Sequence, residues 1–221
     1  MNARDEILAR VASAVDDVRD ADPDAARAAL PRTYRTRDDG TARERIDRFE
    51  QRLVDLDVAV VRARPNQIAE RLAAELARRR ARRVVLPRGL PAAWRTRLPD
   101  VGPVPEDAYP TTLDAADATV TGCALAIADT GTIVLDGGAG QGTRAATLVP
   151  DLHLCVVLAS RLVGTVPEAV ARTREAAAAG APLTWITGPS ATSDVELVRV
   201  PGVHGPRRLV VLLVDDGASG S

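Results

Sequence analysis

The stretch VAVVRARPNQIAERLAAELARRRARRVVLP, residues 58–87, decides the fold class of this chain. Val58–Ala63 is short, rich in β-branched residues and followed by Pro65, which is typical of a buried strand. A helix is predicted over Asn66–Arg80, and Arg83–Pro87 has the composition of a second strand. The order strand, helix, strand predicts a parallel sheet with a right-handed crossover.

Further helices and strands are predicted on both sides of this stretch. A helix over Ala42–Leu56 precedes it, and a Pro-rich region around Trp94 follows it. Two β-rich runs then meet at Asp129-Thr130-Gly131 in a hairpin-like pair, since Gly131 suits the positive φ that tight turns often need. The remaining predicted elements are a helix near Leu113–Ala116, a strand at Leu152–Ala159, a helix at Pro167–Gly180, and strands at Leu183–Gly188, Val195–Val200 and Arg207–Val214. The predicted fold class is α/β, an open, mostly parallel sheet with flanking helices and an N-terminal helical segment.

The first 45 residues differ from the rest in composition. Asn2 can cap a helix whose apolar stripe begins at Ile7, and this helix is expected to pack on the body or on a second subunit of a homo-oligomer. Residues 19–41 are rich in charge and are predicted to be a linker or an irregular arm. Its basic side chains could hold a phosphate or an acidic partner, or form a solvated face: Arg32, Arg35 and Arg37. The predicted organisation is an N-terminal helix and charged arm at 1–45, an α/β domain at 46–214 and a disordered tail at 215–221.

Charge and residue usage exclude several functions. With 29 basic and 30 acidic residues, the chain has no overall field to hold nucleic acid or an anionic membrane. Every basic residue is Arg, which excludes Walker A nucleotide binding, Schiff-base aldolases and pyridoxal-phosphate enzymes, because each needs a Lys amine. The chain shows neither a signal-peptide core nor a run of about 18 apolar residues, so a cytoplasmic protein without a membrane span is expected.

The cysteines and histidines give no sign of a metal centre in this chain. Cys123 and Cys155 lie in apolar segments and are predicted to be buried free thiols. Without a CxxC pair they cannot hold an iron–sulfur cluster, so no cofactor is expected in this chain and any such cluster belongs to a partner. His153 and His204 lack the spacing of a zinc site.

Three loops place glycines and polar side chains directly after predicted strands, where open α/β sheets bind ligands. The first, residues 129–144, has closely spaced glycines ahead of Arg144, which could bind an anion or form a flexible hairpin loop. The second, GPSATSD, offers hydroxyl and N–H groups, and the third is GVHGP. The candidate ligand-binding residues are Thr130, Gly131, Thr132, Gly140, Arg144, Gly188, Ser190, Asp194 and Glu196.

Asp129 and His204 are the candidate catalytic residues. Asp129 could act as a general base, and a structural role in an Asx turn is the alternative. His204 lies between Gly202 and Gly205, so the loop can present its imidazole to a pocket or simply hold it against the backbone. His153 lies inside an apolar run and is expected to be a core or strand-end residue.

Two segments closely resemble the LUD-domain family: AIADTGTIVLDGGAGQGTRAATLVPDLHLCVV and ITGPSATSDVELVRVPGVHGPRRLVVLLV. The resemblance extends from Phe49 to Val214. It departs from the family pattern at Asp129, where the family usually has Glu, and at Ala191, where it usually has Arg. The resemblance implies a fold like that of ribose-5-phosphate isomerase, glucosamine-phosphate deaminase and the CoA transferases. It also implies a part in oxidising L-lactate to pyruvate, in an electron-transfer complex whose partner subunits carry iron–sulfur clusters.

Three functions remain open from the sequence. The first is an accessory or substrate-handling subunit that binds a small anionic metabolite or organises its iron–sulfur partners. The second is a free-standing enzyme acting on a sugar phosphate or an acyl-CoA, with Asp129 or Glu196 as base and His204 as general acid. The third is a scaffolding subunit without a working site.

Overall fold

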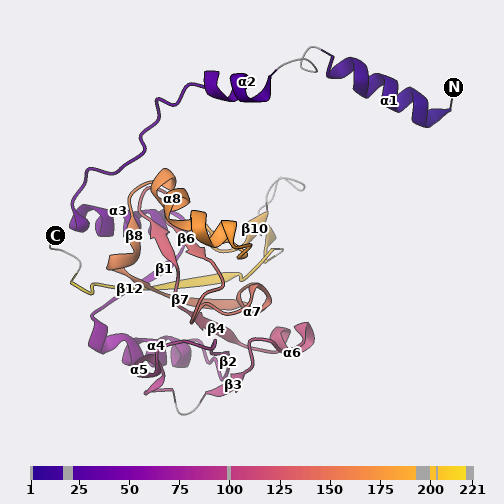
Figure 1. Cartoon of the computed structure of the whole chain (residues 1–221). Helices are drawn as coiled ribbons and strands as arrows, with labels where there is room; N and C mark the ends of the chain where they lie inside the picture. Colours follow the sequence, from indigo (N-terminus) through magenta and orange to yellow (C-terminus); the bar gives the residue numbers. More distant parts are fainter. Residues whose placement is uncertain (1, 17–21, 99–100, 193–199, 203, 218–221) are drawn as a thin grey trace. The chain divides into compact units, whose positions relative to one another are not determined.

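The computed structural model describes residues 2–16, 22–98, 101–192, 200–202 and 204–217, and it divides the chain into two compact units, Met1–Tyr34 and Arg35–Ser221. The first unit contains helices α1 (Ala3–Ala14) and α2 (Pro23–Ala29) (Figure 1). The side chain of Asn2 accepts a hydrogen bond from the Asp5 amide at 3.0 Å, so it caps α1 as predicted. Neither helix contains a buried residue.

The second unit is built on a six-stranded sheet in which every neighbouring pair is parallel. Its strand order is β1-β12-β7-β4-β2-β3. The strands are β1 (Ala59–Ala63), β12 (Arg208–Val214), β7 (Leu152–Leu158), β4 (Ala118–Thr121), β2 (Arg83–Val85) and β3 (Gly102–Val104). The predicted open parallel sheet is confirmed, with β7 and β12 at its centre as the longest strands.

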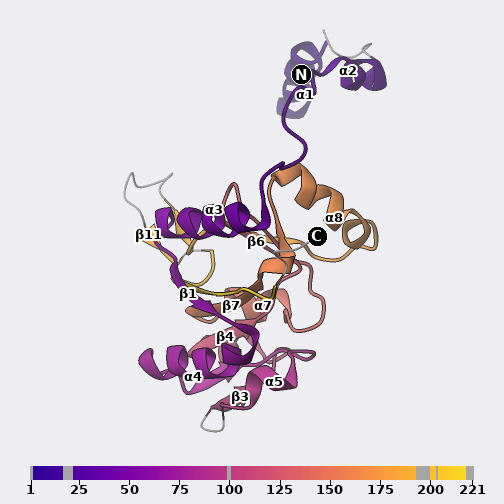
Figure 2. The same cartoon turned by 90° about the vertical axis from the view of Figure 1, so that its left-hand side faces the viewer.

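Helices cover one face of this sheet. Alternate residues of the central strands, such as Leu154 and Leu212, meet the apolar stripe of α4 (Ile68–Arg78) in one buried cluster. Figures 1 and 2 show α4 and α5 (Ala92–Arg95) together on this side. The helix predicted over Asn66–Arg80 is shorter than expected. A 3₁₀ turn, η1 (Pro65–Gln67), precedes it, with Pro65 at a first position where a helix has no use for the missing N–H group.

The other face carries helix α3 (Ala42–Asp55) and a second sheet, of order β8-β5-β6-β9. Its strands are β8 (Leu162–Val163), β5 (Leu125–Ile127), β6 (Thr132–Leu135) and β9 (Thr184–Ile186). Strands β5 and β6 form the predicted hairpin, with Gly131 at φ 68°. The hairpin and β9 are separate from the six-stranded sheet. The hairpin is buried on both faces, so it forms a separate layer.

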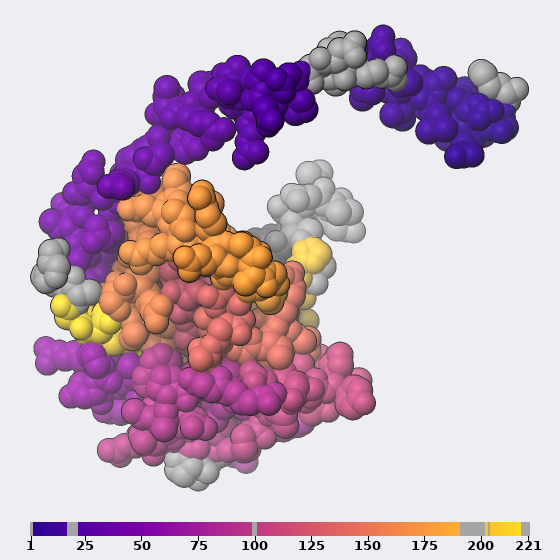
Figure 3. All heavy atoms as spheres, viewed as in Figure 1, coloured from indigo at the N-terminus to yellow at the C-terminus, as the bar shows by residue number. Residues whose placement is uncertain are grey.

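Helix α8 (Val166–Ala178) covers the outer face of the second sheet through Ala169, and Figure 3 shows it on the molecular surface. A capping box starts α8, with the Thr165 hydroxyl accepting from the Glu168 amide. The remaining short elements are α6 (Pro110–Asp114), α7 (Arg144–Leu148), η2 (Ala159–Arg161), β10 (Ala191–Thr192) and β11 (Val200–Pro201). Most of the predicted strand Val195–Val200 lies outside the described residues.

Two predicted boundaries differ from the structure. Residues 35–45, assigned to the arm from their charge, belong to the second unit. The Asp38 amide donates to Glu168 at 3.4 Å, and Asp38 is packed directly against Gly164. At the other end, the predicted tail is attached to the sheet for its first residues. The Asp215 amide donates to the Ala63 carbonyl at 3.0 Å, and the Asp216 carboxylate accepts from the Ser160 amide at 3.0 Å.

None of the helices in the described parts of the chain has both the length and the apolar character needed to cross a membrane.

Candidate functional site

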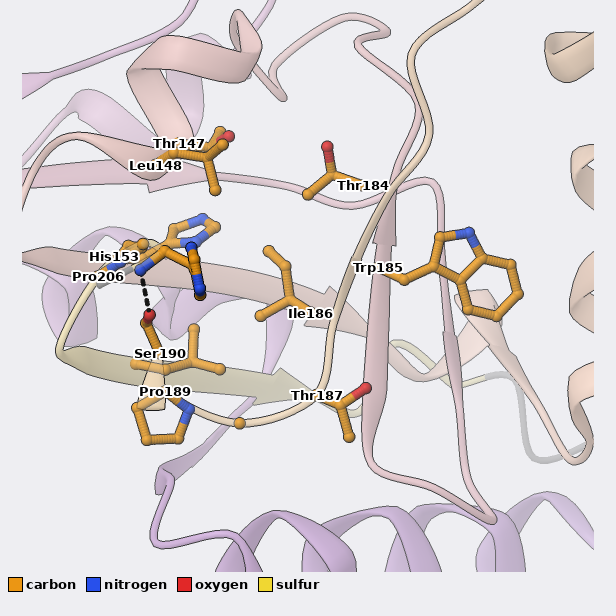
Figure 4. A pocket seen from close by; sticks show the side chains of 14 residues that line it. Thr147, Leu148, His153, Thr184, Trp185, Ile186, Thr187, Pro189, Ser190 and Pro206 are labelled. Carbon is orange, nitrogen blue, oxygen red and sulfur yellow. Dashed lines mark hydrogen bonds between the residues drawn. The ribbon is translucent and has the colours of Figure 1, made fainter. Parts of the chain in front are cut away.

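A cavity of about 240 Å³ opens between the two sheets and is the best candidate site. Four segments meet there: the end of α7, the start of β7, strand β9 with the loop that follows it, and the loop before β12 with the start of that strand. Its walls are formed by Thr147, Leu148, His153, Thr184, Trp185, Ile186, Thr187, Gly188, Pro189, Ser190, His204, Gly205, Pro206 and Leu209. In Figure 4, His153, Ser190 and Pro206 lie on one side of the cavity, and the Trp185 indole points away from them.

The position of this cavity corrects one expectation. Ligand sites of open α/β sheets were expected where strands end, yet His153 and Leu209 are the second residues of β7 and β12, so the cavity lies at the amino ends of these strands. The reason is the second sheet. Strand β9 runs antiparallel to β6 and its following loop, Thr187–Ser190, crosses the amino ends of the main sheet.

Ser190 joins two of the predicted loops. Its amide donates to the Pro206 carbonyl at 2.9 Å, its carbonyl accepts from the Gly202 amide at 2.9 Å, and its hydroxyl oxygen accepts from the His204 amide at 2.9 Å. The structure therefore brings Gly188 and Ser190 of one predicted loop and His204 of the next to one cavity. His204 is exposed at the rim.

The hydrogen bond between the Ser190 hydroxyl and the His204 amide predicts a local change in amide hydrogen exchange. In Ser190→Ala the His204 amide loses its side-chain acceptor, while the two backbone bonds of residue 190 remain. We expect faster amide hydrogen exchange at His204, by roughly fivefold for a bond worth about 1 kcal/mol. The Gly202 amide serves as the internal control. Equal acceleration at both amides would mean that the whole loop had detached, and would contradict the assigned role.

A row of hydroxyl groups connects the hairpin turn to the cavity. The Thr130 and Thr132 hydroxyl oxygens are 2.7 Å apart, and those of Thr132 and Thr187 are 2.8 Å apart. Thr132 is buried, while Thr187 lines the cavity. Two glycines of these loops, Gly131 and Gly188, both pack closely on Leu56 at the end of α3. The cavity wall therefore does not include the predicted residues Thr130, Gly131 and Thr132, which lie behind it.

Thr132→Val tests this row, because valine matches threonine in shape but leaves two neighbouring hydroxyl groups without their partner. We expect the free energy of unfolding to fall by about 1–2 kcal/mol, measured by urea denaturation. Thr132→Ser restores the hydroxyl and should recover most of this loss. A Thr132→Val protein as stable as wild type would contradict the role of the hydroxyl row.

His153 is the buried polar group of the cavity wall. Its side chain is 1% exposed, and its Nε2 lies 2.7 Å from the Thr121 hydroxyl oxygen on the neighbouring strand β4. Its Nδ1 has no hydrogen-bond partner among the described residues. Burial lowers the pKa of the imidazole from 6.5 to about 4, because a charged ring would be poorly solvated there. His153 is therefore neutral at pH 7.

Asp129 does not line the cavity; it belongs to a cluster of ion pairs. One carboxylate oxygen pairs with Arg35, and the other lies 2.9 Å from Nε of Arg48. The Asp129 carbonyl also accepts from Arg52 at 3.1 Å. Because both carboxylate oxygens are engaged by guanidinium groups, the structure favours a structural role for Asp129 over that of a general base.

The same cluster holds Asp38, whose side chain is only 2% exposed. Burial by itself would raise the pKa of the Asp38 carboxyl, but the Arg48 guanidinium, 2.8 Å from its Oδ1, holds this pKa below the ordinary value of 3.8. Arg35, which the sequence offered as a ligand for phosphate or an acidic partner, pairs with Asp129 and Asp38 instead. We call Arg35, Asp38, Arg48 and Asp129 the arm latch.

The polar groups of the glycine-rich loop form hydrogen bonds within the protein. The Asp136 carboxylate accepts from the Gly138 amide at 2.9 Å, and the Gly140 amide donates to the Arg88 carbonyl at 2.8 Å. Gln141 closes the loop through two further bonds to Asp136. Arg144 is exposed at the first position of α7 and does not line the cavity. This geometry gives no support to the anion site expected there.

The remaining predicted residues divide into two groups. Asp194 and Glu196 lie outside the described residues. Cys123 and Cys155 are free thiols, and the contact with Cys155, together with burial, raises the pKa of Cys123 well above its ordinary value. Within the part of the chain that is described, no group of three or more His, Cys, Asp or Glu side chains could hold a metal ion.

The sequence did not predict three threonines of the cavity wall, Thr147, Thr184 and Thr187, and it gave His153 only a core or strand-end position. The available signal for His153 was the strand alternation. It places His153 on the same face of β7 as Cys155 and Val157, which is the face that the second sheet covers. That alternation could not show that a cavity, rather than packed side chains, lies opposite residue 153.

Comparison with known proteins confirms the resemblance found in the motifs. The LUD domain profile matches residues 106–214. A protein named lactate utilization protein C from Deinococcus radiodurans is 47% identical over 171 residues, covering 77% of this chain and 80% of that protein. A protein with the same name from Halalkalibacterium halodurans is 34% identical over 107 residues, covering 47% of this chain and 46% of that protein.

A solved structure supports the fold. The crystal structure of a DUF162 family protein from Deinococcus radiodurans superposes with a TM-score of 0.69 at 40% identity, covering 79% of this chain and 99% of that chain.

Proposed function

Because this chain belongs to the LUD-domain family, we propose that it takes part in the use of L-lactate, as a subunit that binds a small carboxylate metabolite in the cavity between its two sheets. The name of the relative that is 47% identical to it supports the pathway, and the cavity supports the binding role. The proposed ligands are a 2-hydroxy acid such as lactate or a 2-oxo acid such as pyruvate.

The observation that carries the binding role is the composition of the cavity wall. Apolar side chains such as Ile186 and Leu209 alternate there with hydroxyl groups and two imidazoles, which is typical of a small-molecule site. At about 240 Å³ the cavity is smaller than the roughly 300–1,000 Å³ that holds drug-sized ligands. A three-carbon acid matches this size better than an acyl-CoA does. The free-standing enzyme on a sugar phosphate or acyl-CoA is therefore the less favoured function.

The redox step of lactate oxidation is proposed to lie on other subunits. Two cysteines cannot provide the four thiolates of an ordinary iron–sulfur cluster. Removing two electrons from lactate requires an acceptor, and partners that carry iron–sulfur clusters would supply it. In this arrangement the chain handles the substrate or organises the redox partners, which makes it an accessory subunit.

Growth of a gene-deletion strain tests this proposal. The strain is grown on L-lactate or on pyruvate as sole carbon source, and it is complemented with wild type, Gly205→Ala or Gly102→Ala. A Cβ at Gly205 would lie 3.5 Å from Leu148 and 3.7 Å from Ser190, so alanine fits but narrows the cavity. Gly102→Ala is the matched control, because its Cβ would meet only the Arg82 carbonyl oxygen at 3.6 Å.

We expect the deletion strain to grow poorly on L-lactate but normally on pyruvate. Wild type and Gly102→Ala should restore growth on lactate, whereas Gly205→Ala should restore it poorly. Normal growth of the deletion strain on lactate would contradict the pathway. Full rescue by Gly205→Ala would contradict the role of the cavity. Co-purification of the tagged wild-type chain with iron–sulfur proteins from lactate-grown cells tests the partners separately.

A further inference from the structure

The cavity contains one buried nitrogen whose hydrogen bonding is incomplete. His153 lines the cavity, is 1% exposed, and has no partner for Nδ1 among the residues that the structure describes. Its other nitrogen, Nε2, is 2.7 Å from Thr121, which does not line the cavity. Nδ1 is therefore the ring nitrogen without a partner, and a buried polar atom of this kind requires one.

The bond to Thr121 indicates which nitrogen carries the proton. A neutral imidazole has one N–H donor and one bare acceptor, while a hydroxyl group has one donor and two lone pairs. If Nε2 carried the proton, both the buried Thr121 hydroxyl proton and the Nδ1 lone pair would be unpaired. If Thr121 donates to Nε2 instead, only the Nδ1 proton is unpaired. The second arrangement leaves fewer buried groups unsatisfied, so Nδ1 is a donor.

We propose that the Nδ1–H group of His153 donates a hydrogen bond to a carboxylate or carbonyl oxygen of the bound metabolite and thereby selects ligands with an acceptor oxygen at this buried wall. This inference rests on the proposed function. It deepens it by naming the residue that recognises the ligand and the chemical group that it recognises. A carboxylate oxygen carries charge, so its hydrogen bond with this N–H group is stronger than that of an uncharged alcohol oxygen.

The rest of the cavity fits such a ligand. Ile186 and Leu209 provide apolar contacts for a short carbon chain, while the Ser190 and Thr187 hydroxyls can pair with a second polar group. A neutral donor at the wall needs no buried counter-ion, so the ligand can bring the only formal charge. The exposed His204 imidazole lies at the rim of the same cavity and provides a further polar group there.

Two substitutions at position 153 separate the two ring nitrogens. In His153→Asn the amide nitrogen takes the place of Nδ1, whereas in His153→Gln it takes the place of Nε2 and keeps the bond to Thr121. Binding of pyruvate and L-lactate to the purified full-length chain is measured by calorimetry, with 2-propanol as the probe that lacks a carboxylate. We expect wild type to bind the acids, His153→Asn to retain most of the affinity, and His153→Gln to lose on the order of tenfold or more.

Nitrogen NMR of histidine-labelled wild-type protein tests the same inference without a substitution. The free protein should show His153 as the Nδ1–H tautomer, and the Nδ1 signal should shift on addition of either acid. An Nε2–H tautomer, or binding of the acids without a change at Nδ1, would overturn the inference and leave the proposed function standing. Failure of wild type to bind either acid would overturn both.

Discussion

Gly164→Ala is expected to destabilise the protein by roughly 3 kcal/mol, at the upper end of the usual cost of overpacking, and to lower the melting temperature by roughly 6–12 °C. A Cβ at Gly164 would lie 2.0 Å from the Cβ of Asp38, far inside any allowed contact. Asp38 cannot move away cheaply, because it is buried and paired with Arg48 at 2.8 Å. The expected result is release of the arm latch, measured by thermal unfolding.

Limited trypsin digestion shows where the damage occurs. Release of the latch should expose the bonds after Arg35 and Arg37, so these cleavages should accelerate in Gly164→Ala before the rest of the domain is cut. Gly102→Ala should melt like wild type. In an Asp38→Gly background the clash is absent, so adding Gly164→Ala should cost much less than it does alone. Equal costs in both backgrounds would mean that Gly164 is required for another reason.

Wild-type protein without ligand is expected to lose about 1.5 kcal/mol of its free energy of unfolding between pH 6.5 and pH 5 because of His153. The pKa of this imidazole is lowered from 6.5 to about 4 by burial. In this pH window the unfolded chain binds a proton that the folded protein does not accept, so acid favours unfolding. The stabilisation is complete above pH 6.5 and disappears progressively as the pH falls towards 4.

Urea denaturation of His153→Gln at the two pH values measures this effect. Glutamine does not titrate, so the loss between pH 6.5 and pH 5 should shrink by about 1.5 kcal/mol relative to wild type. Gly102→Ala changes no titratable group, so it is the control and should keep the wild-type pH dependence. Carboxyl groups with lowered pKa values, such as Asp38 and Glu168, act at lower pH, below ordinary values of 3.8 and 4.5. An unchanged slope in His153→Gln would contradict burial of a neutral imidazole.

Residues that the sequence predicted to form one site belong to two separate features of the structure, the arm latch and the cavity. Asp129 pairs with Arg35 and Arg48, whereas His204 lies at the rim of the cavity with Ser190. Substitutions of Asp129 should therefore act first on stability, and substitutions of His153 on ligand recognition. The hydroxyl row from Thr130 through Thr132 to Thr187 connects the hairpin turn to the cavity wall.

Much of the fold was predictable because local patterns specify it. The strand, helix and strand in residues 58–87 predicted the parallel sheet, and Gly131 predicted the hairpin turn, since these features depend on neighbouring residues. The motif order also predicted the family. The sequence alone thus determined the fold class and most elements, and it predicted two of the loops that line the cavity.

Tertiary structure decided which side chains meet. Asp129 pairs with Arg35 across 94 positions in the chain, and no local pattern distinguishes that ion pair from a free general base. Strand alternation placed His153 on a particular face of β7, but only the packing of a second sheet opposite that face turned its position into the wall of a cavity. Side-chain periodicity reports which face a residue occupies, whereas the layer that covers this face depends on contacts between distant segments.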